Sequence, residues 1–234
     1  MELELQNRES QAIPIPGYLQ QVYWWAYVHP RSVYLFERQW LVNLILWGNF
    51  PRLRDAALDA LGVKITGRTL QVACVYGDLT SRLAARMQSD ARLDVIDILT
   101  IQLDNLARKL PNHGAVRLMQ GDSAVLPFES DCYDRVLLFF LLHEQPEGVR
   151  RKTLAEALRV VKPGGEIVIV DYHKPHKLHP LYFPMAAILK TLEPFALDLW
   201  RHSIIEWLPM NAKLAAIETW TMFGGLYQLL RIKK

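Results

Sequence analysis

The chain has 234 residues, of which 51% are hydrophobic and 22% are charged, and its formal net charge is +3. A chain of this size can bury a full core, so we expect a single domain with an elaboration. The small positive charge is far from the strongly basic surface of nucleic-acid-binding proteins, so no nucleic-acid partner is expected. It permits attraction to an anionic membrane surface.

The two cysteines and the first ten residues indicate in which cellular compartment the protein is found. Cys74 and Cys132 show neither metal-binding nor disulfide spacing and are predicted to be reduced core residues of a cytosolic protein. The acidic, polar start MELELQNRES does not look like a secretory signal peptide. The longest uncharged apolar stretch, residues 40–50, is too short for a bilayer, which needs roughly 20 residues. A soluble or peripheral protein is predicted.

The N-terminal section, residues 1–66, is dense in Trp and Tyr. Apolar side chains recur there at helical spacing, and they predict one helix face. Two interpretations are open: a core helix that covers a sheet, or an interfacial helix that forms a lid over a lipid substrate. The face consists of Val33, Phe36, Trp40, Leu44 and Trp47.

The middle of the chain alternates short β-rich runs with helical ones. Apolar runs such as VLLFFLL are typical of a parallel sheet that is covered on both faces. The alternation predicts a doubly wound α/β fold with ligand crevices beyond the carboxyl ends of the strands. Strands are predicted over residues 69–75, 92–98, 115–120, 134–142 and 165–172, and helices over 79–87, 101–110 and 148–161.

The last section begins with a break in regular structure at Pro175 and Pro180. An apolar helical insertion is predicted over about residues 176–210, and its lysines would suit anionic lipid heads. Two β-like runs then flank Gly224 and Gly225, which predicts an antiparallel hairpin at the end of the chain.

Polar residues follow three of the predicted strands. Gly77 lies in the turn after the first strand, in LQVACVYGDLT. Asp97 ends the second strand, where it would either accept a ribose hydroxyl or cap the next helix. Asp122 follows the third strand and could accept a hydrogen bond from an adenine amino group.

The ordered segments YGDLT, VID, QGDSAVLPF, LLHEQP, RVVKPGGEIVIVDY and FGGLYQ resemble class I S-adenosylmethionine (SAM) methyltransferases, and look closest to those of ubiquinone and menaquinone biosynthesis. The resemblance implies a seven-stranded, mostly parallel sheet over residues 67–234, with N-terminal aromatic helices, the helical insertion and the C-terminal hairpin. SAM would be the co-substrate. The implied SAM-binding residues are Gln71, Ala73, Cys74, Val75, Gly77, Asp97, Ile98, Asp122 and Ser123.

The loop after the first strand departs from that family pattern. Gln71 stands where the family has an acidic residue, Cys74 and Val75 replace glycines, and Tyr76 replaces a small residue. We expect the larger side chains to displace the amino-acid end of SAM. An ammonium group without a carboxylate partner is also easier to deprotonate, and its nitrogen then becomes a nucleophile.

The altered loop and the aromatic stretches VYWWAYVHPR, RQWLVNLILWGNF and LEPFALDLW are similar to the family of rhodoquinone-biosynthesis proteins. This resemblance implies an enzyme that replaces a ring methoxy group of ubiquinone with an amino group, with SAM as amino donor and Mn²⁺ required. It would lie at the cytoplasmic face of an energy-transducing membrane as a peripheral protein. Substrate-binding residues are predicted to be Trp25, Tyr27, Trp40 and Tyr172.

Manganese prefers carboxylate and imidazole ligands. Candidates at the strand ends are Asp78, His143, Glu144, Asp171 and His173, and the candidate catalytic residues are Tyr76, Asp78, His143 and Glu144. Alternatives are open for three of them: Asp78 as a helix cap, His143 as a buried, satisfied histidine, and Glu144 as an acidic residue that favours a helix start. Two other functions also stay open, a quinone or phenol methyltransferase and a non-catalytic SAM-binding scaffold in a quinone-biosynthesis complex.

Overall fold

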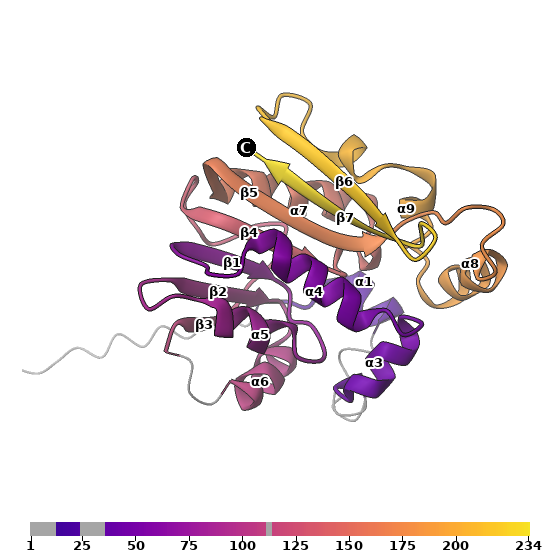
Figure 1. Cartoon of the computed structure of the whole chain (residues 1–234), viewed down its shortest axis with the longest axis horizontal. Helices are drawn as coiled ribbons and strands as arrows, with labels where there is room; N and C mark the ends of the chain where they lie inside the picture. Colours follow the sequence, from indigo (N-terminus) through magenta and orange to yellow (C-terminus); the bar gives the residue numbers. More distant parts are fainter. Residues whose placement is uncertain (1–12, 24–35, 111–113) are drawn as a thin grey trace, which may run out of the picture.

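The computed structural model describes residues 13–23, 36–110 and 114–234. Its centre is a seven-stranded sheet with the order β3-β2-β1-β4-β5-β7-β6 (Figure 1). Only the pairs that include β7 are antiparallel, so the predicted doubly wound sheet and C-terminal hairpin are confirmed. The strands are β1 (Arg68–Val72), β2 (Arg92–Asp97), β3 (Val116–Gln120), β4 (Tyr133–Phe139), β5 (Val161–Tyr172), β6 (Ala216–Met222) and β7 (Tyr227–Lys233).

Helices cover both faces of this sheet. Helix α4 crosses in front of the strands in Figure 1, and α7 lies behind them. The helices are α1 (Gly17–Val22), α3 (Gln39–Ile45), α4 (Phe50–Leu61), α5 (Leu79–Arg86), α6 (Thr100–Lys109), α7 (Glu147–Val160), α8 (Tyr182–Leu192) and α9 (Asp198–Arg201), with 3-10 turns at Leu142–Glu144 and Ile204–Trp207.

The two central strands are buried on both faces. Every side chain over residues 136–139 of β4 and 167–170 of β5 is buried, which explains why these segments read as continuous apolar runs rather than alternating ones. The edge strand β6 is different, because it exposes Glu218, Thr219 and Trp220 to solvent. The charge of Glu218 on this edge disfavours pairing with other chains.

Helix α4 was not predicted from the sequence. Its buried Leu53, Ala57, Leu58 and Leu61 share one face, and that face contacts β5 and β7. The helix that covers this side of the sheet is therefore α4. On α3, by contrast, Trp40 is 59% exposed and Leu44 is 64% exposed, so the interpretation of this face as a core helix is wrong. Val33 lies outside the described residues.

Backbone geometry explains where two predicted strands end early. Ala73 has φ of 73° and Phe140 has φ of 53°, so β1 stops at Val72 and β4 stops at Phe139. Left-handed backbone cannot continue a strand. Both kinks lie at the carboxyl ends of neighbouring strands, the edge at which doubly wound sheets bind ligands.

Candidate functional site

A cavity of about 620 Å³ lies at the carboxyl ends of β1, β2, β4 and β5. This volume is in the range of small-molecule sites. Its polar floor comes from the strand ends, and its apolar walls come from α1, α3 and α8. The prediction of a ligand crevice beyond the carboxyl ends of the strands agrees with this cavity.

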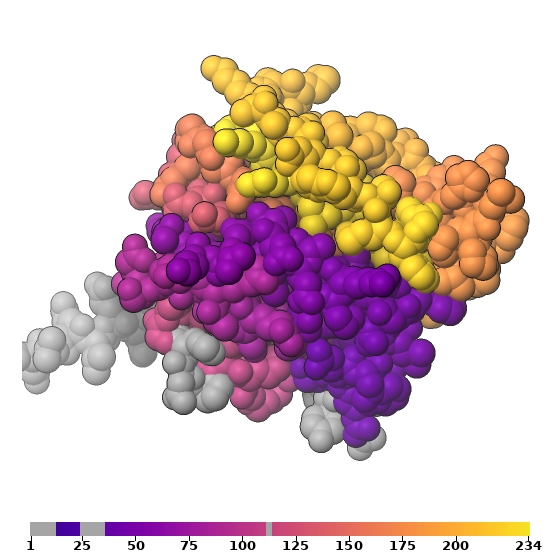
Figure 2. All heavy atoms as spheres, viewed as in Figure 1, coloured from indigo at the N-terminus to yellow at the C-terminus, as the bar shows by residue number. Residues whose placement is uncertain are grey.

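The apolar walls are contributed by segments that are far apart in the sequence. Leu44 and Trp47 come from α3 and its C-terminal end, and Ile188 and Leu192 come from α8. The two walls touch where Trp47 Nε1 donates a hydrogen bond to Met185 Sδ at 3.0 Å. Figure 2 shows the same neighbourhood from outside, with the indigo segment next to the orange α8 segment. The combined wall suits an apolar ligand group.

Asp97 lies at the polar end of the cavity. Its Oδ2 accepts the Cys74 N–H at 2.7 Å and its Oδ1 accepts the Leu99 N–H at 2.8 Å. Burial raises the pKa of Asp97 to about 6. Each carboxylate oxygen keeps a second lone pair, so Asp97 can still accept the hydrogen bonds of a ribose.

The predicted adenine-binding residues line the same end of the cavity. Asp122 Oδ1 accepts the Ala124 N–H at 2.8 Å, and both Asp122 and Ile98 line the cavity. Ser123 Oγ lies 2.9 Å from Thr153 Oγ1 and accepts a hydrogen bond from Gln145 Nε2 at 3.0 Å. The sequence did not single out Gln145, since an isolated amide has no motif around it.

The loop between β1 and α5 is filled by its own side chains. Gln71 is fully buried; its Nε2 donates to the Ala73 carbonyl at 3.0 Å, and its Oε1 accepts the Thr80 hydroxyl at 3.0 Å. Cys74, Val75 and Tyr76 line the cavity. Both ends of the Gln71 amide are thus occupied inside the protein, and the loop offers no carboxylate at this position.

Tyr76 is held firmly in that loop. Its hydroxyl accepts a hydrogen bond from Gln102 Nε2 at 2.8 Å, and its ring stacks on Phe36 with 6.0 Å between the centroids. Gly77 follows with φ of 84°, and a Cβ there would come within 2.9 Å of the Phe50 ring. A fixed aromatic ring therefore occupies part of the loop's hollow.

His143 and Asp171 form a buried pair at the other end of the cavity. His143 Nδ1 lies 2.9 Å from Asp171 Oδ1, while Asp171 Oδ2 accepts the N–H groups of Leu142 and His143. Burial opposes the imidazolium, but the Asp171 carboxylate outweighs it and raises the pKa of His143 to about 9. The remaining nitrogen, Nε2, lies 3.7 Å from Glu144 Oε1. His143 and Glu144 both line the cavity.

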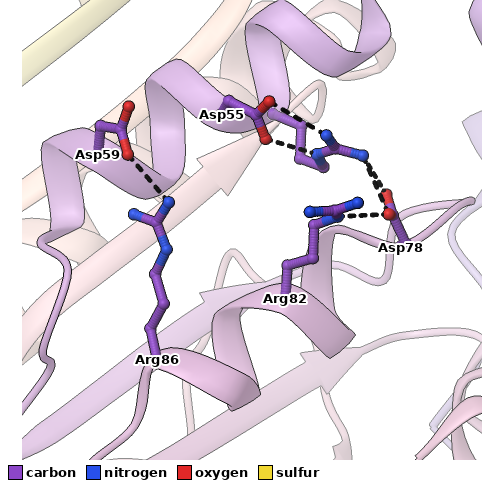
Figure 3. Close-up of polar contacts among 6 residues, drawn as sticks. Asp55, Asp59, Asp78, Arg82 and Arg86 are labelled. Atoms are coloured by element: carbon purple, nitrogen blue, oxygen red, sulfur yellow. Dashed lines mark hydrogen bonds and ion pairs between the residues drawn. The ribbon is translucent and has the colours of Figure 1, made fainter.

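The five predicted manganese ligands do not come together. Asp78 is ion-paired with Arg54 and Arg82 (Figure 3), and His173 Nδ1 lies 2.7 Å from the Gly225 carbonyl oxygen, beside a separate shallow cavity. Within residues 13–23, 36–110 and 114–234, no group of three or more His, Cys, Asp or Glu side chains could hold a metal ion. The donor set of these residues does not fit manganese.

Asp78 instead joins α5 to α4, and we expect the Asp78→Asn variant to lose stability rather than catalysis. Partial burial raises the pKa of Asp78, but Arg82 and Arg54 outweigh it and hold this pKa below its usual value. The loss should be about 1–2 kcal/mol at neutral pH, measured by urea denaturation. Because the folded-state pKa is the lower one, the contribution is lost as the pH falls through the acidic range.

The matched control for this prediction is Asp59→Asn. Asp59 makes one ion pair between the same two helices, with Arg86, and is mostly exposed. An exposed ion pair is worth about 0–1 kcal/mol, so the free energy of unfolding of this variant, measured by the same urea denaturation, should stay close to that of the wild type. A loss of turnover by Asp78→Asn without a loss of stability would contradict the structural role.

The predicted substrate-binding residues are only partly placed. Tyr172 lines the cavity, and its ring lies 4.9 Å from that of His143. Trp40 is on the exposed side of α3 and does not line the cavity, while Trp25 and Tyr27 lie outside the described residues. The sequence analysis missed Tyr18 and Glu193, which also line the cavity.

Comparisons with known proteins agree with this geometry. Residues 40–208 match the ubiE/COQ5 methyltransferase family. The chain is similar to the ubiquinone/menaquinone biosynthesis C-methyltransferase UbiE of Idiomarina loihiensis, with 31% identity over 57% of this chain and 53% of the relative. It is also similar to the demethylmenaquinone methyltransferase of Bacillus velezensis, with 27% identity over 81% of this chain and 78% of the relative. The chain thus spans only about half the length of the Idiomarina relative.

Among solved structures, the chain is similar to phosphoethanolamine N-methyltransferase 2 of Haemonchus contortus in complex with S-adenosyl-L-methionine. The TM-score is 0.65 at 14% identity, over 94% of this chain and 60% of that one. This likeness shows the class I methyltransferase fold. Separately, no helix in the described part of the chain is long and apolar enough to cross a membrane.

Proposed function

The chain belongs to the ubiE/COQ5 methyltransferase family, and from this premise we propose that it uses SAM to replace a ring methoxy group of ubiquinone with an amino group. The product would be rhodoquinone. The observation that supports amine transfer is the loop between β1 and α5, where the Gln71 amide is tied to Ala73 and Thr80 and side chains fill the hollow.

The two ends of the cavity suit the two substrates. Asp97 would accept hydrogen bonds from the ribose of SAM, and Asp122 would accept one from its adenine amino group. Val75 and Tyr76 occupy space in the loop, so the amino-acid end of SAM would turn toward β4 and β5. The quinone ring would lie against Tyr172, with its tail along the apolar wall of α3 and α8.

The ring carbon that bears a methoxy group is electrophilic, because a quinone methoxy group is a vinylogous ester. The amino nitrogen of SAM would add to this carbon and expel the methoxy group as methanol, which carries away a proton from the nitrogen. Loss of the proton on the donor carbon next to the nitrogen would then move two electrons into the quinone ring and leave an imine. Water would hydrolyse this imine to the aminated quinol, the reduced form of rhodoquinone, and the 2-oxo acid of the donor. His143 would hold its proton on Nε2 and donate it as a hydrogen bond to the quinone carbonyl oxygen. Its pairing with Asp171 favours the charged form that such a donor needs.

Manganese enters this proposal only as an additive to be tested. The resemblance to rhodoquinone-biosynthesis proteins implies the ion, but the described side chains do not fit it. The role expected of a Lewis acid on the quinone carbonyl falls instead to the His143 imidazolium.

We further propose that the chain binds the cytoplasmic face of the membrane as a peripheral protein. Leu44 on α3 and Ile188 and Leu192 on α8 are exposed and also line the cavity. These three apolar side chains are therefore shared by the outer surface and the cavity, and the exposed Lys190 adds a positive charge for anionic lipid. A polyprenyl tail could stay in the bilayer while its ring enters the site.

Methyl transfer to a quinone is the second candidate, and the names of the relatives favour it. In that reaction the methyl group of SAM would move to the ring, and S-adenosylhomocysteine would remain. The third possibility, a non-catalytic scaffold, predicts no turnover by the isolated protein.

The deciding experiment incubates the purified chain with ubiquinone in lipid vesicles and with SAM that carries ¹⁵N in its amino group. Mass spectrometry of the quinone is expected to show ¹⁵N incorporation and loss of one methoxy group. Parallel reactions with and without Mn²⁺ test the ion. A methylated quinone with S-adenosylhomocysteine, and no ¹⁵N in the ring, would overturn amine transfer.

A further inference from the structure

The cavity is unusual in its charge. Four carboxylates line it, and among the described lining residues none is Lys or Arg. Such a site favours a cationic ligand, and SAM carries two positive centres, the sulfonium and the ammonium group. The acids are Asp97, Asp122, Glu144 and Glu193.

Three of these carboxylates are already engaged. Asp97 accepts the backbone N–H groups of Cys74 and Leu99, and Asp122 accepts that of Ala124. Glu144 Oε1 lies 3.7 Å from His143 Nε2. Glu193 is different, because it accepts no backbone N–H: the Tyr23 hydroxyl interacts with its carboxyl group, and its Oε2 is buried without a hydrogen-bond partner among the residues that the structure describes. A buried carboxylate oxygen without a partner is costly to maintain, so a ligand that satisfies it is the natural explanation.

The place of Glu193 is fixed by the fold. It follows the last residue of α8, and its N–H donates to the Leu189 carbonyl at 3.0 Å. Burial raises the pKa of Glu193, while His143 and the Tyr23 hydroxyl favour its charged form. Glu193 therefore interacts electrostatically with His143. Both residues line the end of the cavity where the quinone ring would lie.

We propose that Glu193 is the carboxylate that binds the amino group of SAM in this cavity. The inference rests on the proposed function and deepens it. The Gln71 side chain is hydrogen-bonded to Ala73 and Thr80, so the loop after β1 provides no carboxylate for the amino group of SAM. Glu193 provides a carboxylate that interacts with His143. A carboxylate there places the nitrogen of SAM next to the quinone ring. Because burial raises the pKa of Glu193, this carboxylate is also a base for the proton that the ammonium group must lose before the nitrogen attacks.

The test pairs two ligands with three forms of the protein. S-Adenosylhomocysteine and its deamino analogue, in which hydrogen replaces the amino group, are titrated by calorimetry into the wild type, Glu193→Gln and Glu144→Gln. Glutamine keeps the size of the side chain and removes its charge. Glu144→Gln is the matched control, since it removes the other glutamate of the same cavity.

We expect the wild type to bind the amino ligand about 10- to 100-fold more tightly than the deamino analogue, the range for a hydrogen bond to a charged group. Glu193→Gln should bring this ratio near 1 without changing the affinity for the deamino analogue. Glu144→Gln should keep most of the ratio. An unchanged ratio in Glu193→Gln, or its collapse in Glu144→Gln alone, would overturn the assignment.

The binding ratio needs no turnover, so it is independent of the product assay. A methylated product would refute amine transfer but would not affect the conclusion about Glu193 from the binding ratio. An unchanged binding ratio would refute the role of Glu193 but would not affect the conclusion about amine transfer. Should Glu193→Gln fail to fold, Glu193→Met provides a second neutral side chain of similar length for the same titrations.

Discussion

Replacing His143 with alanine is expected to lower kcat by about 10²- to 10³-fold, the usual cost of one donor to a developing oxyanion. In the proposed reaction Nε2 donates to the quinone carbonyl, and alanine leaves that oxygen without its donor. Binding of S-adenosylhomocysteine should change little, because the predicted nucleoside contacts are at Asp97 and Asp122. Initial rates of quinone conversion and calorimetry measure the two quantities.

Two further variants make this result interpretable. Asp171 keeps the N–H groups of Leu142 and Tyr172 as partners when the imidazole is removed, so thermal melting should show a folded His143→Ala protein. His143→Gln retains a neutral donor and should recover part of kcat. His176→Ala, an exposed histidine outside the cavity, is the control and should behave as the wild type. Full activity of His143→Ala would refute the donor role.

Restoring the family pattern in the loop after β1 should change the product. In the triple variant Gln71→Asp, Cys74→Gly, Val75→Gly, a carboxylate becomes available for the SAM ammonium and two side chains leave the cavity wall. We expect at least about a 10-fold loss of aminated quinone, since a misplaced nucleophile loses the advantage of orientation. Methylated quinone and S-adenosylhomocysteine are the expected new products, read by mass spectrometry.

The same triple variant distinguishes the two candidate activities, amine transfer and methyl transfer. If the chain is a quinone methyltransferase with a drifted loop, the restored residues should raise an existing methyl-transfer activity. The paired control is Cys132→Gly, which replaces the other cysteine, outside the cavity, and should leave the product unchanged. An increase in aminated product from the triple variant would contradict the proposed role of the loop.

The sheet was predictable because its signal is strong in the sequence. Buried runs such as residues 136–139 and the Gly224–Gly225 hairpin reflect local patterns that packing does not reverse. The strand-end positions of Asp97 and Asp122 followed from the same alternation. Strand order and the carboxyl-end cavity then came with the fold class.

The remaining features depend on contacts between distant segments. Asp78 has the position of a site residue, yet Arg54, 24 positions away, pairs with it. Glu193 lies in the stretch LEPFALDLW, where no sequence pattern marks it as a site residue, and only the packing of α8 brings it to the cavity. Helix α4 was missed because its charged face, with Arg52, Asp55 and Asp59, obscures the buried stripe.

The bonds of Gln71 constrain the mutational routes that are open to this chain. An aspartate introduced alone at position 71 would face the Ala73 carbonyl oxygen that now accepts the Gln71 amide, and two acceptors repel each other in a dry interior. Val75 and Tyr76 would still fill the space that the new acid needs. A change at position 71 alone is therefore expected to destabilise the loop, so an acid should be tolerated there only after other side chains of the loop have become smaller.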